Sequence, residues 1–223
     1  MGMLVVIWDF DGVIFDSMHL KCEGFKTLFK RHAKASQEAL KAFEDYHYTS
    51  GGIGRAEKIT YFYNHILKQP LKAAQIETLV DEFGQIITKD LFSREHLNQD
   101  VLSFIKAYYQ NCTFHIASAA LHSELQILCE FLGLLPYFKS IEGSPPSKAK
   151  VLANLKTAYA YTSQEMLLIG DSKSDYESAR VNNIGFLGYN SALLQDMLPQ
   201  AYITRFQGLD LKTLATKAGL NQF

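Results

Sequence analysis

A short apolar run followed at once by two carboxylates dominates the interpretation of this sequence. Leu4 to Trp8 is apolar throughout and leads directly into Asp9-Phe10-Asp11-Gly12. Such a run predicts a strand covered on both faces. In extended backbone, residues i and i+2 point to the same side, so the two carboxylates crowd one spot. That arrangement is costly without a cation or a proton and indicates a metal or acid/base site, although Asp and Gly are also ordinary turn residues. This stretch alone leaves both interpretations open.

Beyond residue 96 the pattern alternates between strands and helices. The expected strands are 112–117, 138–142, 166–169, 184–187 and 201–203, and the expected helices between them are 97–110, 121–132, 148–161 and 174–181. Alternation of this kind predicts a parallel sheet with right-handed crossovers. We therefore expect an α/β fold, a three-layer Rossmann-like core with a parallel sheet.

The stretch between residues 16 and 95 has a different character. Helical periodicity covers 17–33, 36–48, 55–68 and 72–92, with breaks at Gly51-Gly52 and at Gln69-Pro70. No strand pattern interrupts it, and its size suits a small domain. The sequence therefore predicts an all-helical cap, residues 16–95, inserted into a core formed by residues 1–15 and 96–223.

Composition narrows the possible partners and compartment. The net charge of −1 gives no electrostatic basis for binding nucleic acid or an anionic membrane. Seven histidines include no i, i+4 pair, which argues against zinc, and three cysteines form no CxxC motif. No secretory or membrane-spanning run is visible. We expect a cytoplasmic protein with reduced cysteines, and its oligomeric state stays open.

Polar residues follow four of the expected strands. In α/β cores ligands bind outside the carboxyl ends of the strands, so these residues are expected to meet. The acidic groups suit a hard cation, and Mg²⁺ is the usual choice beside a phosphate, whereas the hydroxyl and the ammonium suit an anion. Lys150 competes with Lys148 for the last role, and we prefer Lys148 because Leu152 then starts the apolar face of the helix. The set is Asp9, Asp11, Ser118, Lys148, Asp171 and Asp175.

These ordered motifs resemble those of the haloacid dehalogenase-like hydrolase superfamily. The resemblance rests on Asp9-Phe-Asp11-Gly12 and its continuation to Ser17, on Ser118, on Lys148, and on Gly170-Asp171 with Asp175. The position of the helical insertion is similar to that of the helical cap in the branch of phosphoglycolate phosphatases and β-phosphoglucomutases. The motif at Ser118 departs from relatives, which often have a polar residue where this chain has Ala119.

The resemblance implies a role for each motif residue. Asp9 is the implied nucleophile that forms an aspartyl-phosphate, and Asp11 the implied general acid and base. Mg²⁺ is implied between the Asp9 side chain, the Asp11 backbone carbonyl and Asp171, with Asp175 a ligand directly or through water. The implied phosphate-binding groups are Ser118, Lys148, Gly12 and Ala119.

Two cations of the cap are candidates for substrate contact. Arg55 follows a loop with three glycines, and similar enzymes place a substrate-selecting loop there; the alternative is a plain connection with Arg55 solvated. Lys21 stands where β-phosphoglucomutase-like relatives have a histidine, which disfavours a mutase.

The expected function is that of a Mg²⁺-dependent phosphatase acting on a small phosphorylated metabolite. A sugar phosphomutase of the same superfamily is the alternative, because it shares the aspartyl-phosphate step. A binding protein without turnover is a remote third possibility, since it has no need of Asp9, Asp11, Lys148 and Asp171 together. The identity of the phosphomonoester stays open.

Overall fold

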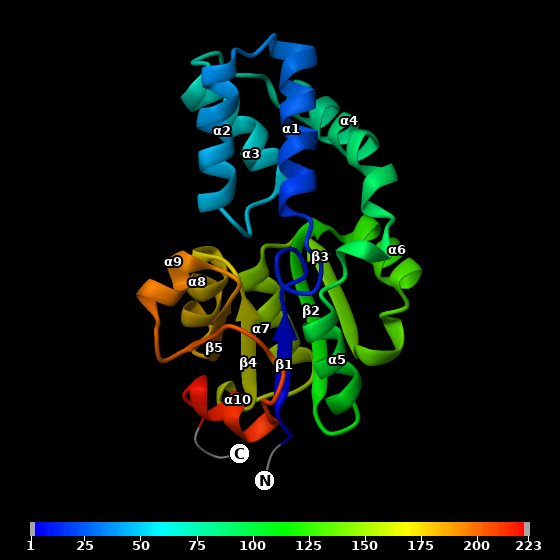
Figure 1. Ribbon diagram of the computed structural model, residues 1–223, viewed down its shortest axis with the longest axis vertical. Coiled ribbons are helices and arrows are strands. Elements are labelled where there is room, and N and C mark those ends of the chain that lie inside the picture. Colours follow the sequence, from blue (N-terminus) through cyan, green and yellow to red (C-terminus); the bar gives the residue numbers. More distant parts are fainter. Residues whose placement is uncertain (1–2, 221–223) are drawn as a thin grey trace.

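A computed structural model describes residues 3–220 of the chain. Within that range six strands form one sheet in the order β3-β2-β1-β4-β5-β6, and all neighbouring strands are parallel (Figure 1). The strands are β1 (Val5–Trp8), β2 (Thr113–Leu121), β3 (Ser140–Ser144), β4 (Met166–Gly170), β5 (Gly185–Tyr189) and β6 (Tyr202–Ile203). The predicted α/β class with a parallel sheet is confirmed.

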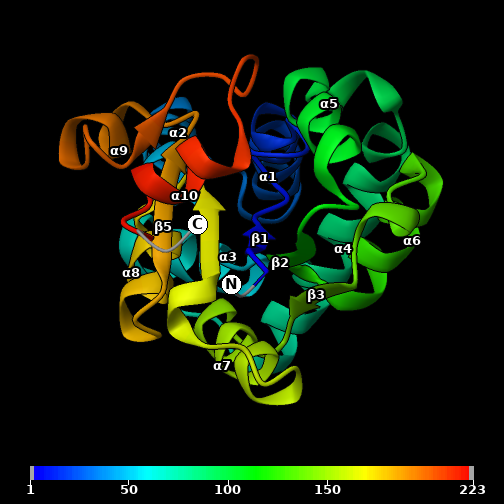
Figure 2. The same ribbon diagram turned by 90° about the horizontal axis from the view of Figure 1, so that it is seen from below.

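Helices cover both faces of this sheet, as Figure 2 shows with α7 and α8 on one side and α5 on the other. The alternation of side chains along β1 explains the two layers. Val5 and Ile7 pack in a core with α7 and α8, and Val6 and Trp8 pack in a second core with α5 and Phe206. The helices of this part are α5 (Gln99–Tyr108), α6 (His122–Leu132), α7 (Lys148–Ala158), α8 (Lys173–Val181), α9 (Ala192–Met197) and α10 (Leu211–Lys217).

Helices α1 to α4, which we call the cap, stand beyond the carboxyl ends of the strands (Figure 1). They are α1 (Met18–Ala33), α2 (Gln37–Thr49), α3 (Arg55–Tyr61), which continues as a π-helical turn (Phe62–Ile66), and α4 (Ala73–Leu91). Phenylalanine rings from α1, α2, α4 and the turn form the centre of the cap, with Phe29 stacked on Phe62 and Phe25 on Phe83. The cap therefore has an aromatic centre of its own.

The two connections between cap and core lie side by side. The backbone N–H of Asp16 donates to the carbonyl of His96 at 2.8 Å, and Phe15 forms an isolated bridge with Leu97. The chain therefore leaves the core and returns to it at nearly one point. Such a narrow connection suits a unit that moves relative to the sheet.

Some element bounds differ from the sequence prediction. β2 continues to Leu121 instead of ending before Ser118, with a register shift against β3 between Ala117 and Leu121. The Ser-Ala-Ala segment has small side chains, which leave room for the backbone to stay extended past the irregularity. β3 begins two residues later than expected, and α9 and α10 were not expected. Among the described residues, the helices are all too short or too polar to cross a membrane.

Candidate active site

The carboxyl ends of β1 and β4 define the candidate site. From β1 the chain continues outward through β2 and β3, and α7 then carries it back to β4 on the other side of β1. This reversal of strand order opens a crevice at the strand ends. Asp9 follows β1, Asp171 follows β4, and Lys148 is the first residue of α7.

Four charged side chains meet in this crevice. The Lys148 ammonium lies 2.8 Å from the Asp9 carboxylate and also forms an ion pair with Asp175. Carboxylate oxygens of Asp9, Asp171 and Asp175 all lie within 4.8 Å of one another. Asp9, Lys148 and Asp175 are buried. Two of the three carboxylates are therefore paired with one buried ammonium, and the third, that of Asp171, lies beside them.

The electrostatics of this group are unbalanced. Burial and the charge of Asp175 raise the pKa of Asp9 to about 8, although Lys148 acts against them. Burial and the charge of Asp9 raise the pKa of Asp171 well above its ordinary value. Burial lowers the pKa of Lys148, but the charges of Asp175 and Asp9 outweigh it, so the ammonium stays protonated. One further positive charge would let all three carboxylates ionise together.

The donor set fits a divalent cation. Within the described chain, Asp171 Oδ1 is a buried oxygen that accepts no hydrogen bond. Buried polar atoms without a partner are rare in folded proteins, so this oxygen calls for a ligand. Carboxylate oxygens are the ligands that Mg²⁺ prefers. Asp9, Asp171 and Asp175 are the residues that could hold it.

Asp11 has a different environment from Asp9. Its carboxylate accepts a hydrogen bond from the hydroxyl of Ser17 and forms an ion pair with Lys21, each at 2.5 Å. Burial acts to raise the pKa of Asp11, but the charge of Lys21 and the hydrogen bonds from Lys21 and Ser17 outweigh it and lower the pKa. Ser17 occupies the position before α1 expected of a helix cap, yet its hydroxyl serves Asp11 instead of the helix backbone. The pKa values of the two aspartates are thus shifted in opposite directions, although only Phe10 separates them in the sequence.

Gly12 allows the turn after β1 to lie close to the carboxylate of Asp171, which follows β4. Its φ is +82°, and a Cβ atom there would lie 2.0 Å from Asp171 Oδ2. Only glycine adopts this backbone conformation at little cost and leaves room for the carboxylate. Its carbonyl accepts a hydrogen bond from Asn190 at 2.9 Å.

The segment of β2 that contains Ser118 also lies beside these carboxylates. Ser118 is buried, and its hydroxyl accepts a hydrogen bond from the backbone N–H of Ala120 at 3.1 Å. Ala119 and Ala120 line the pocket that also contains Asp9 and Asp11. The backbone of this segment, in extended conformation, therefore borders the site.

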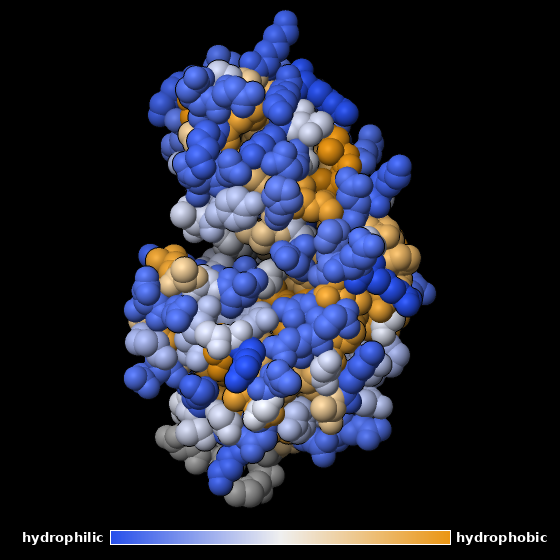
Figure 3. All heavy atoms as spheres, in the orientation of Figure 1, coloured by the Kyte–Doolittle hydropathy of each residue, from blue (hydrophilic) through white to orange (hydrophobic). Residues whose placement is uncertain are grey.

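The glycine loop of the cap, residues 51–54, directly contacts the fourth motif, residues 170–175. The carbonyl of Gly51 accepts a hydrogen bond from Ser174 at 3.0 Å, and a Cβ atom on Gly52 would lie 2.1 Å from the Ser174 hydroxyl. The pocket beneath this loop has a volume of about 50 Å³, room for a few water molecules. Figure 3 shows a mostly hydrophilic face that is hollowed at the waist between cap and core.

Arg55 lines that pocket, but its guanidinium is hydrogen-bonded to the carboxylate of Glu124. Nη1 donates to Glu124 Oε1 at 2.9 Å, and Nη2 forms a second contact with the same carboxylate. The guanidinium also lies over the ring of Phe83, 5.3 Å from its centroid. Arg55 thus connects α3 of the cap to α6 of the core, and its contact with substrate stays a prediction.

Four residues near the site were missed by sequence reasoning. They are Ser17 as a partner of Asp11, Glu124 as the partner of Arg55, and the buried pair of His47 and Lys58. Ser17 belongs to the first motif, but its contact with Asp11 depends on how the chain turns between them. Glu124, His47 and Lys58 have no local pattern, because each acquires its role from another helix. Lys150, which competed with Lys148 in the sequence for the anion-binding role, is exposed.

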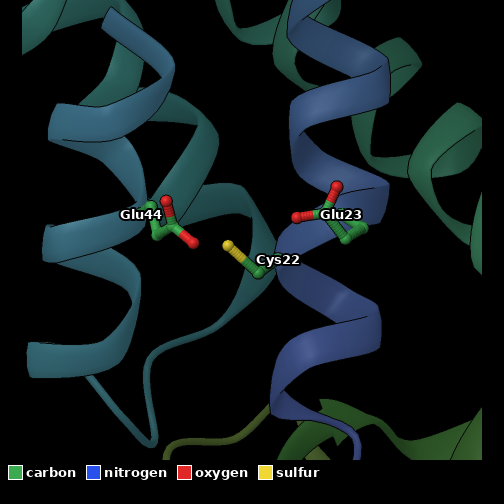
Figure 4. Close-up of side chains that lie close together, drawn as sticks. All are labelled: Cys22, Glu23 and Glu44. Atoms are coloured by element: carbon green, nitrogen blue, oxygen red, sulfur yellow. The ribbon is translucent and has the colours of Figure 1, made fainter. Parts of the chain in front are cut away.

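A second group of possible metal ligands lies within the cap. Figure 4 shows Cys22 and Glu23 on α1 facing Glu44 on α2. Lys26 forms ion pairs with Glu23 at 2.8 Å and with Glu44 at 3.1 Å. Burial raises the pKa of the Cys22 thiol to about 11, so it stays protonated at neutral pH. A lysine already compensates these carboxylates, and the group is an ion-pair cluster between helices.

Several solved structures share this fold. A β-phosphoglucomutase from Clostridium difficile has 14% identity and a TM-score of 0.78, covering 98% of both chains. A predicted phosphatase from Clostridium acetobutylicum has 18% identity and a TM-score of 0.76, covering 97% of this chain and 98% of its own. A predicted phosphoglycolate phosphatase from Haemophilus somnus has 16% identity and a TM-score of 0.66, covering 84% and 85%.

Sequence comparison defines the family. The sequence has no match among curated proteins. The family model of the haloacid dehalogenase-like hydrolases matches residues 6–189, from β1 to the end of β5. This span includes the cap and all four motifs, and the family predicted from the motifs is thereby confirmed. The chain belongs to the haloacid dehalogenase-like hydrolases.

Proposed function

We propose that this protein is a Mg²⁺-dependent phosphatase that hydrolyses a small phosphomonoester through an aspartyl-phosphate on Asp9. The observation that carries the proposal is the buried group of Asp9, Asp171 and Asp175, which shares one ammonium and leaves Asp171 Oδ1 without a partner. A cation and an ammonium around one anion are what phosphoryl transfer requires. Mg²⁺, held by these carboxylates and the Asp11 backbone carbonyl, would neutralise the charge of the phosphate.

Asp9 is the proposed nucleophile. Its Oδ1 is fixed by Lys148 at 2.8 Å and by the backbone N–H of Phe10 at 2.7 Å, which leaves the other oxygen free to attack. An O–P bond to Asp9 forms while the bond from phosphorus to the leaving alcohol oxygen breaks. Lys148 binds a phosphate oxygen during this step, and the backbone N–H of Ala119 with the hydroxyl of Ser118 supplies further donors. The backbone N–H of Gly12, which the sequence suggested as another donor, already donates to the carbonyl of Phe15 at 2.8 Å.

Asp11 is the proposed proton carrier. Asp11 takes up a proton when substrate enters and its contact with Lys21 opens, and in the first step it gives that proton to the leaving alcohol. In the second step the ionised carboxylate takes a proton from water, which attacks phosphorus and releases Asp9. The lowered pKa of Asp11 suits this second role.

A sugar phosphomutase is the second candidate. The fold shared with a β-phosphoglucomutase supports it, and the first chemical step is the same. Lys21 supports the phosphatase, because it stands where β-phosphoglucomutase-like relatives have a histidine. The two functions differ in whether phosphate is released or returned to a sugar.

A screen of small phosphomonoesters, with Mg²⁺ or with a chelator, tests this proposal. We expect phosphate release that depends on Mg²⁺ and falls at least 10³-fold in Asp9→Asn, since the nucleophile is lost. Asp196→Asn, at an exposed aspartate, is the matched control and should retain activity. Phosphate release that survives Asp9→Asn would contradict the mechanism. Exchange between glucose phosphate isomers without phosphate release would favour the mutase.

A further inference from the structure

Among the residues that the structure describes, one buried ammonium in the pocket beneath the cap forms no ion pair with a carboxylate. Lys58, on α3, is 4% exposed and lines the same pocket as Asp9 and Asp11. The other cations that line it each have an acidic partner, Lys21 with Asp11 and Arg55 with Glu124. Within residues 3–220, Lys58 forms no salt bridge; its ammonium donates only to His47, to Nδ1 at 3.2 Å and to the carbonyl at 3.3 Å.

His47 does not supply the missing negative charge. Its Nε2 lies 3.0 Å from the carbonyl oxygen of Met18, and a carbonyl only accepts, so Nε2 carries the hydrogen. Nδ1 is therefore the bare nitrogen that accepts from Lys58. Burial and the charge of Lys58 lower the pKa of His47 to about 3, so the imidazole is neutral. The histidine orients the ammonium of Lys58 without neutralising it.

Keeping an unpaired ammonium buried is unfavourable. Burial and the charge of Lys21 lower the pKa of Lys58 to about 8, so at neutral pH most molecules still carry the charge. Two of the three N–H groups are used by His47, and one remains for another partner. An uncompensated charge in a cleft is typical of a binding site, where the ligand brings the opposite charge.

The position of Lys58 identifies which part of a ligand it would meet. The phosphate to be transferred lies at Asp9 and Lys148 on the core side, as proposed above, whereas Lys58 reaches the pocket from the cap side. The leaving alcohol must therefore lie between them. We infer that Lys58 is a specificity-determining residue that binds a second oxyanion, a carboxylate or a phosphate, carried by the leaving alcohol of the substrate. This inference rests on the proposed phosphatase function and deepens it by naming a class of dianionic substrates.

Two matched pairs of phosphomonoesters test the inference. 3-Phosphoglycerate and glycerol 1-phosphate differ by a carboxylate against a hydroxymethyl group, and glucose 1,6-bisphosphate and glucose 1-phosphate differ by a second phosphate. We expect the wild-type enzyme to prefer the member with the second oxyanion at least tenfold in kcat/KM in one pair. That pair identifies the oxyanion as carboxylate or phosphate. A wild type without preference in both pairs would overturn the inference.

Variants connect the preference to Lys58. Lys58→Gln should reduce the preference at least tenfold, mainly through KM, because the second oxyanion then lacks its partner. Lys58→Met serves if the first variant fails to fold, as a thermal melt reveals. Lys41→Gln, at an exposed lysine on α2 of the same cap, is the control and should retain the preference. Equal losses for both members of the preferred pair would show that Lys58 has only a structural role.

A further substrate distinguishes a wrong phosphatase proposal from a wrong role for Lys58. Hydrolysis of p-nitrophenyl phosphate, which has no second oxyanion, reports on the phosphatase mechanism alone. If that hydrolysis is absent, the affinities of the same four compounds, measured by calorimetry with wild type and Lys58→Gln, still decide whether Lys58 binds the second oxyanion. A preference that is equal in both proteins would overturn the inference in that case too.

Discussion

At the scale of single residues, neighbours in sequence acquire opposite properties from their surroundings. Asp9 and Asp11 belong to one short motif, yet burial and the charge of Asp175 raise the pKa of Asp9 to about 8, whereas Lys21 lowers that of Asp11. The motif predicts that both aspartates take part in the reaction. The division of labour between nucleophile and proton carrier depends on side chains that other elements bring in.

Gly12 allows a prediction at this scale. Gly12→Ala should lower the free energy of unfolding by about 2 kcal/mol or more and weaken Mg²⁺ binding, because the new Cβ meets the Asp171 carboxylate in a left-handed backbone conformation. Gly208→Ala is the matched control, since Gly208 has a φ of +83° and open space around it. It should cost about 1 kcal/mol from backbone strain alone. Denaturant unfolding and Mg²⁺ titration of both variants measure the difference; equal effects would contradict the proposed crowding.

At the scale of elements, contacts between cap and core decide what closes over the site. The glycine loop packs on Ser174 of the fourth motif, and Arg55 at the start of α3 reaches Glu124 on α6. Each of these contacts joins an element of the insertion to an element of the sheet layer, so both must break when the cap opens.

The Arg55–Glu124 pair leads to a second prediction. In a double-mutant cycle with Arg55→Gln and Glu124→Gln, we expect a coupling of about 1 kcal/mol in the free energy of unfolding, because the guanidinium is largely buried and contacts both carboxylate oxygens. The Glu177–Arg180 pair, exposed on α8, is the control and should couple less. Urea denaturation of the four proteins in each cycle provides the measurement. A coupling no larger than that of the control would show that the pair does not hold the cap closed.

At the scale of the whole molecule, a buried histidine makes stability depend on pH. His115 on β2 contacts Ser140 of β3 at 2.8 Å and Tyr161 before β4 at 3.1 Å. Burial and the charge of Lys139 lower its pKa to about 4, from an ordinary value of 6.5. The unfolded chain therefore binds this proton more readily than the folded chain, and stability is lost as pH falls from 6.5 toward 4.

His115→Gln tests this dependence. Between pH 7 and pH 4.5 the free energy of unfolding of the wild type should fall by about 2 kcal/mol more than that of the variant, because the variant has no group to protonate there. Denaturant melts at both pH values give the two differences. His122→Gln, at a half-exposed histidine on α6, should behave like the wild type. Parallel losses in wild type and His115→Gln would indicate that other groups cause the acid sensitivity.

By itself, the sequence determined the class of fold and the main chemical groups. Apolar runs ending in Asp9 and Asp171 are local patterns, and the rule that parallel strands share a carboxyl edge placed these residues at one site without coordinates. Family resemblance added the roles. The positions of strand ends were less certain, as the extension of β2 to Leu121 shows, because pairing across the sheet sets them.

Only the tertiary structure decided the surroundings of those groups. Asp11 is ionised because Lys21 of α1 and Ser17 just before α1 contact it, and Arg55 is engaged because α6 presents Glu124. Among the described residues, Lys58 has no acidic partner because the cap folds it against a neutral His47. These relations join residues between 6 and 69 positions apart. The physical reason is that charge and burial act through space, so a pKa or an unpaired ammonium is a property of the packed chain and has no local pattern in the sequence.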